Sequence, residues 1–219
     1  MASFHRLPIP DLIRDARDLY TNARDDDEIF ALLSAEPWGF TEADFDAGLA
    51  LVQAVTTALG TEAREELEAR QATTAYDAAA DAVRAAYNLH RDLLRSRYDR
   101  DAPEYSGLGL AGETPGDRED LLKDAADFYG TLSSQTDIVD AVRGLSAETV
   151  AEAQGLVEAA RDDGSAQTKE AGDAERARAT QQAAVRALRE HAALTAKDAA
   201  AALKDHPQLR ERLGLRERS

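Results

Sequence analysis

The chain has no cysteine, and this absence excludes several kinds of chemistry at once. Disulfide bonds, thiolate nucleophiles and zinc sites with thiolate ligands all require cysteine. Stability therefore rests on the apolar core, which a chain of 219 residues is long enough to bury without metals or disulfides.

Aromatic residues are also scarce, at 5% of the chain, although 43% of the residues are hydrophobic. Much of the apolar fraction is alanine, which favours helix and buries little surface. This composition predicts a core of closely spaced helices rather than layers of bulky side chains.

Basic residues are outnumbered, because 26 Lys and Arg face 42 Asp and Glu and the formal net charge is -16. Nucleic-acid phosphates and anionic lipid headgroups are bound by clustered Lys and Arg. We therefore predict neither a nucleic-acid partner nor a membrane partner. The same acidity suits a salt-rich cytoplasm, where mutual repulsion between carboxylates is screened.

Long apolar runs are missing too. The start, MASFHRLPIPDLIRD, has no apolar run of the length that a secretory signal needs, and no window approaches the roughly 18 apolar residues of a membrane span. We expect a soluble cytoplasmic protein.

The chain does contain a segment that is written twice. DLIRDARDLY at 11–20 and DLLKDAADFY at 120–129 share six of ten positions, including Tyr20 and Tyr129. Residues 38–52 also resemble residues 143–157, and both copies end in a segment with a proline followed by LGL, at 99–110 and 204–215. These matches predict a tandem duplication of a unit of about 105 residues, with repeat 1 at 1–110 and repeat 2 at 111–219.

Apolar residues recur at intervals of three and four within each repeat, which predicts helix throughout and no strand. The expected fold is an all-α antiparallel bundle in which the two repeats pack together, related by a pseudo-two-fold axis. The first helical region of repeat 1 is expected to break near 22–26, where DDD provides a cap for a restart. The predicted helices cover 11–35, 41–60 and 61–102 in repeat 1, and 118–142, 146–163 and 165–205 in repeat 2.

The DLLKDAADFY-type start and the D-x-P…LGL close of the repeats resemble a group of bacterial proteins made of two tandem helical-bundle units. The resemblance covers most of the chain through short motifs. It implies the architecture described above and no activity, cofactor or site.

Two motifs that are typical of cofactor and metal sites do not indicate such a site here. GLGLAG at 107–112 matches the dinucleotide-binding pattern G-x-G-x-x-G, but that fingerprint follows a strand and opens a helix, whereas this one follows a helix. We interpret it as the loop between the repeats. No histidine has a glutamate three residues before it, so the paired Glu-x-x-His motif of diiron bundles is absent, and we predict no metal and no cofactor.

Four residues are candidates for a site. His90 lies on the apolar stripe of its helix between Tyr87 and Leu94, where an imidazole needs a partner. It is either a ligand-binding or proton-transfer residue, or a structural histidine that bonds to a tyrosine hydroxyl or a backbone group. Tyr20 and Tyr129 either line a shared pocket with Tyr87 and His90 or act as packing anchors.

These observations lead to two hypotheses on function. The first is a non-enzymatic helical scaffold or interaction module, which binds a protein partner or a second copy of itself as a homodimer. The alternative is a bundle, with or without enzymatic activity, that binds a small ligand in a pocket between the repeats lined by Tyr20, Tyr87, His90 and Tyr129. No arrangement of nucleophile, base and oxyanion site is recognisable, so we favour the first.

Overall fold

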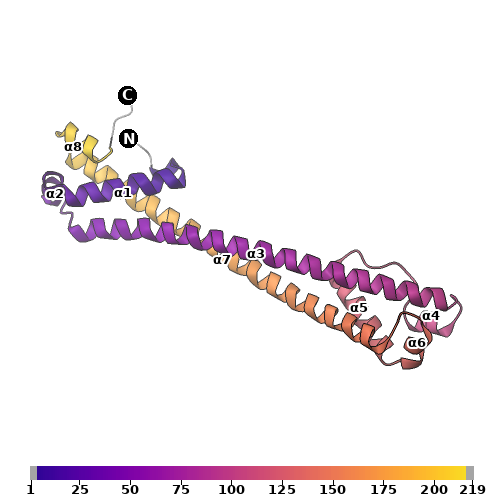
Figure 1. The fold of residues 1–219 in the computed structure, drawn as a ribbon. Coiled ribbons are helices and arrows are strands. Elements are labelled where there is room, and N and C mark those ends of the chain that lie inside the picture. Colours follow the sequence, from indigo (N-terminus) through magenta and orange to yellow (C-terminus); the bar gives the residue numbers. More distant parts are fainter. Residues whose placement is uncertain (1–3, 216–219) are drawn as a thin grey trace. The chain divides into compact units, whose positions relative to one another are not determined.

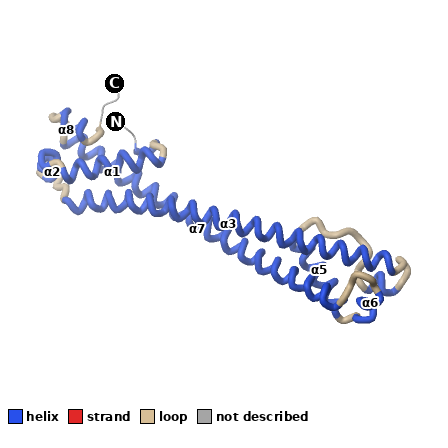
Figure 2. The backbone as a smooth tube through the Cα atoms, in the orientation of Figure 1, coloured by secondary structure: helices blue, strands red, loops and turns tan. Residues whose placement is uncertain are grey.

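All regular secondary structure in the described part of the chain is helical. The computed structural model describes residues 4–215, and Figure 2 shows helices and connecting loops throughout that range. The elements in chain order are η1 (Phe4–Arg6), α1 (Ile9–Asp25), α2 (Asp27–Ser34), α3 (Glu42–Arg97), α4 (Pro103–Gly107), α5 (Arg118–Ser133), α6 (Thr136–Ala141), α7 (Ala147–Ala202) and α8 (Pro207–Arg212). The sequence-based prediction of an all-α fold is therefore confirmed.

Two helices are far longer than the others, because α3 and α7 contain 56 residues each. The sequence predicted a helix end at Gly60 and another near 163, and both predictions are wrong. Glycine inside a helix costs only about 1 kcal/mol relative to alanine. The Ala, Leu and Glu residues around Gly60 favour helix strongly enough to continue through it.

Carboxylates cap the starts of α2 and α3. The break before α2 is where it was expected, and the carboxylate of Asp26 accepts from the backbone N–H groups of Glu28 and Ile29. Before α3, Oδ2 of Asp44 accepts from the backbone N–H of Thr41 at 2.8 Å, the carboxylate half of a capping box.

The chain divides into two compact units, which we call unit 1 and unit 2. Unit 1 consists of the described residues up to Glu65 and from Ala174 onward, whereas unit 2 consists of Glu66–Asp173. Both α3 and α7, labelled in Figure 1, continue from one unit into the other. These boundaries differ from the repeat boundary at 110, so each unit combines segments of both predicted repeats.

The core of unit 1 forms where α1, the start of α3 and the end of α7 pack together, with α2 and α8 beside them (Figure 1). Along α1 the buried positions recur every three or four residues, which places them on one face of the helix. The fully buried side chains of this core include Leu12, Leu19, Tyr20, Ile29, Leu33, Phe45, Val55, Leu188 and Leu203.

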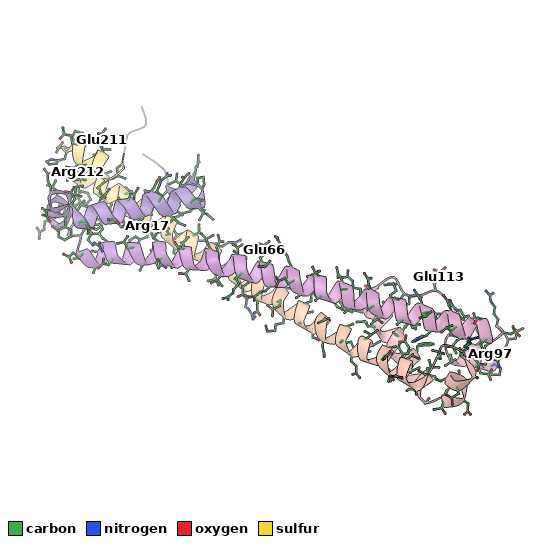
Figure 3. The ribbon with its side chains drawn as sticks, viewed as in Figure 1. Arg17, Glu66, Arg97, Glu113, Glu211 and Arg212 are labelled. Carbon is green, nitrogen blue, oxygen red and sulfur yellow. The ribbon has the colours of Figure 1, made fainter. Side chains whose placement is uncertain are left out.

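The α8 helix is fixed to the start of α2 by polar contacts at the surface of unit 1. The side chain of Arg212, labelled in Figure 3, forms ion pairs with Asp26 and with Glu28, whose Oε2 lies 3.1 Å from Nη1. The backbone carbonyl of Arg212 accepts from the Asn22 amide at 2.7 Å. These contacts connect the last described helix of the chain to its first two.

The core of unit 2 is built from α5, the end of α3 and the start of α7, with α4 and α6 alongside. Its buried positions on α5 repeat the spacing seen on α1. The most buried side chains include Val83, Tyr87, Leu94, Leu110, Leu121, Phe128, Tyr129, Leu132, Val150 and Val157.

The middle of each long helix lacks buried side chains. In α3 none of the residues from 59 to 79 is buried, and in α7 none from 161 to 176 is buried. Among residues 4–215, none of the helices combines the length and the apolar character of a membrane-spanning segment.

Candidate functional site

Three of the four candidate residues meet in the core of unit 2. The hydroxyl oxygen of Tyr129 lies 3.1 Å from Nδ1 of His90, and the two rings meet edge to face with their centroids 5.7 Å apart. The ring of Tyr87 packs edge-on against those of Tyr129 and Phe128, with centroid separations of 6.5 and 5.2 Å. His90 is therefore bonded to a tyrosine hydroxyl, one of the two roles that the sequence left open.

Burial favours the neutral form of each member of this cluster. Removal from water raises the pKa of Tyr129 and Tyr87 and lowers the pKa of His90. Tyr129 is fully buried and His90 is 6% exposed. A solute therefore has no direct access to the His90–Tyr129 contact, which acts as a buried polar link between α3 and α5.

Tyr20 belongs to unit 1, where it forms a contact of the same kind with a different histidine. Its hydroxyl lies 2.7 Å from Nδ1 of His191 on α7, and the side chain is fully buried. Burial raises the pKa of Tyr20, and a hydrogen bond with the neighbouring Thr195 hydroxyl offsets part of this rise. The structure therefore brings Tyr87, His90 and Tyr129 together and places Tyr20 in the other compact unit.

His191 is the partner that the sequence-based reasoning missed. It lies one helical turn before Thr195, and Thr195 is the residue that corresponds to His90 when the ends of the two predicted repeats are aligned in sequence. A search for polar residues within one turn of that position would have found it.

Two surface hollows lie away from these four residues. One, of about 370 Å³ in unit 2, lies among Tyr76, Lys123 and Arg161. The other, of about 630 Å³ in unit 1, is lined largely by residues 181–190 of α7. The four candidate side chains, Tyr20, Tyr87, His90 and Tyr129, thus pack the two cores and do not line these hollows.

The GLGLAG loop binds guanidinium groups through its carbonyl oxygens. Nη2 of Arg91 lies 3.2–3.5 Å from the carbonyl oxygens of residues 109–112, and Nη2 of Arg95 lies 2.7 Å from that of Gly112. A phosphate-binding loop must instead present N–H groups to its ligand. The loop therefore has the wrong polarity for a nucleotide and serves as an anchor for two arginines of α3.

Tyr20 constrains the sequence of the helix packed against it. A Cβ atom added to Gly48 of α3 would lie 2.4 Å from Cε1 of the Tyr20 ring, whereas one added to Gly60 of the same helix would meet no atom within 4 Å. Gly48 therefore permits the close approach of α1 to α3.

We expect Gly48→Ala to lower the free energy of unfolding by about 3 kcal/mol, because the new methyl group overpacks a closely packed core. The matched change Gly60→Ala should raise it by about 1 kcal/mol through helix propensity alone. Urea denaturation of both variants measures the difference. Equal effects of the two substitutions would show that Tyr20 is not packed as described.

No family model, curated protein or solved structure matches the chain. The resemblance to tandem helical-bundle proteins thus stays a prediction.

Proposed function

We propose that this protein is a non-enzymatic helical scaffold, in which α3 and α7 join two packed units and unit 2 binds a basic protein partner. The observation that carries the proposal is the pair of helical stretches without buried residues, 59–79 and 161–176. A stretch of helix that buries no side chain fits a segment that bridges two packed regions. These stretches have the character of connectors between the units.

We further propose that the scaffold arose by tandem duplication, with segments exchanged between the repeats. The start of repeat 1 packs with the end of repeat 2 in unit 1, and the start of repeat 2 packs with the end of repeat 1 in unit 2. In support, α3 and α7 have the same length and start 105 positions apart, at Glu42 and Ala147.

Corresponding arginines give independent support to this assignment. Arg84 of α3 donates to the carbonyl oxygen of Gly116, two residues before α5, at 3.2 Å. Arg189 of α7 donates to the carbonyl oxygen of Leu7, two residues before α1, at 3.0 Å. Arg84 and Arg189 are 105 positions apart, and Leu7 and Gly116 are 109 apart, which are the two offsets that relate the repeats in sequence.

Backbone conformation supports the same correspondence. Gly39 and Gly144 both have positive φ, at 64° and 98°, and each lies three positions before the start of a long helix. Gly109 and Gly214 have positive φ in the two LGL segments. Unit 1 contains the start of α3 and the end of α7, whereas unit 2 contains the end of α3 and the start of α7. The proposal therefore implies that the two long helices run antiparallel. The pseudo-two-fold axis stays a prediction.

Charge makes unit 2 the more suitable surface for a basic partner. Unit 2 has 23 acidic and 11 basic residues, whereas the sequence segments of unit 1 have 19 and 15. On α1, the carboxylates of Asp11 and Asp15 form ion pairs with Arg14. On α5, the corresponding Asp120 and Asp124 have no ion pair with a described residue. The α5 carboxylates are therefore available to an incoming cation.

The test compares two triple variants. We expect Asp120→Asn, Asp124→Asn and Asp127→Asn together to weaken binding of a lysine-rich peptide about tenfold, since each exposed charge contributes a few tenths of a kcal/mol or more. The matched control changes the corresponding Asp11, Asp15 and Asp18 to Asn and should leave the affinity within about twofold. Isothermal titration calorimetry at two salt concentrations gives both affinities and their ionic component.

Equal loss of affinity in both triple variants would contradict the assignment of the surface to unit 2. Binding that does not weaken with salt would contradict an electrostatic partner surface altogether. Growth of the oligomer with protein concentration in light scattering, together with the absence of peptide binding, would favour self-association instead.

A further inference from the structure

We propose that unit 1 contains a binding site for a small carboxylate ligand, in the hollow formed by η1, the start of α1 and residues 181–190 of α7. Its volume of about 630 Å³ is in the range of small-molecule sites. Ile9 and Val185 provide apolar lining, and the remaining lining side chains are polar or charged. Because most of the lining side chains are polar or charged, the hollow suits a ligand with a charged group better than a wholly apolar one.

Gln181 provides an uncharged donor and acceptor in the lining of the hollow. It is 8% exposed, it lines the hollow, and its side-chain amide forms no hydrogen bond with any residue that the structure describes. In the described part of the chain, the buried side-chain atoms without a partner do not include the Gln181 amide, so the amide is accessible from the hollow and is free to bond with a ligand. The corresponding residue of α3 is Tyr76, so this amide is particular to unit 1.

Two guanidinium groups lie beside Gln181 in the lining. Arg189 uses Nη2 to bind the Leu7 carbonyl oxygen, but its Nε is buried and has no acceptor. Arg186 lines the same hollow and has no ion pair or side-chain hydrogen bond with a described residue. Arginines three positions apart lie on the same face of a helix, so both present donors to the hollow.

The donor set indicates the charge of the ligand. The hollow is lined by two guanidinium groups and one carboxylate, that of Glu190. One positive charge of the lining therefore has no counterpart there, and a ligand with a single negative charge would balance it. The sequence from 174 to 219 is also unusual in this acidic chain, with ten basic and six acidic residues. A carboxylate matches the planar fork of an arginine, and a short apolar tail matches Ile9 and Val185.

The experiment uses two probes with the same tail and opposite charges, hexanoate and hexylammonium, on the full chain. We expect hexanoate to shift the side-chain amide resonances of Gln181 in a saturable manner in ¹H–¹⁵N NMR spectra, and hexylammonium to leave them unchanged. Arg186→Gln should weaken hexanoate binding about tenfold, because an exposed side chain is removed without disturbing the core.

The matched control is Arg178→Gln, which makes the same charge change on α7 at a residue that pairs with Glu62 outside the hollow. It should leave hexanoate affinity unchanged. The proposal is overturned if hexanoate does not shift the Gln181 resonances, if hexylammonium shifts them equally, or if Arg178→Gln and Arg186→Gln weaken binding alike. An equal shift with inorganic phosphate would overturn the requirement for a carboxylate with an apolar tail.

Discussion

Cutting the chain between Glu113 and Thr114 should leave the two fragments associated under native conditions. Glu113 lies in the exposed loop between α4 and α5 (Figure 3), so a protease recognition sequence inserted after it is accessible. Each fragment contributes to both cores, because unit 1 combines residues up to 65 with residues from 174, and unit 2 combines residues on both sides of the cut. Separation of the fragments therefore requires both cores to open.

The expected result is that the cut protein elutes from a size-exclusion column at the volume of the uncut protein. The midpoint of urea denaturation should also become dependent on protein concentration after the cut, because unfolding then releases two chains instead of one. The uncut protein with the same insertion is the control. Fragments that separate in buffer would show that each repeat packs on itself and that the exchange of segments is wrong.

Replacement of Arg91 by alanine should be the most destabilising single substitution at a polar residue of unit 2. The side chain is 2% exposed, and it contacts the carbonyl oxygens of residues 109–112 and the ring of Tyr87, whose centroid lies 5.0 Å from Cζ. Its loss removes the side-chain donor of the Gly109 and Ala111 carbonyl groups, which Arg95 does not replace, and opens a cavity. We expect the free energy of unfolding to fall by about 3 kcal/mol.

Two further substitutions separate charge from geometry at this position. Arg91→Lys keeps the positive charge but removes the planar fork, so it should recover less than half of the loss. Arg95→Ala removes a neighbouring arginine that binds the same loop but is one-third exposed, and it should cost about 1 kcal/mol. Urea denaturation measures all three variants. A loss for Arg91→Ala no larger than that for Arg95→Ala would contradict the role assigned to the buried guanidinium.

The candidate site shows how far residue patterns alone extend. The stripe from Tyr87 to Leu94 placed His90 in the core, and the need of a buried imidazole for a partner suggested a tyrosine hydroxyl. That partner is Tyr129. The grouping of Tyr20 with these residues was a different inference, since it assumed that corresponding residues of two repeats meet. Tyr20 instead contacts His191 within unit 1.

The sequence alone determined the helical class, the face that each helix buries and the start of α2 at its Asp26 cap. These are local properties, because periodicity and capping depend on residues within one or two turns of each other. Only the tertiary structure decided that α3 continues through Gly60, that the GLGLAG carbonyl groups bind Arg91, and that the end of α7 packs with α1 rather than with α5. An apolar stripe shows that a helical face is buried but not which other helix covers it. The pairing of segments that are far apart in the sequence therefore depends on the packing of the whole chain.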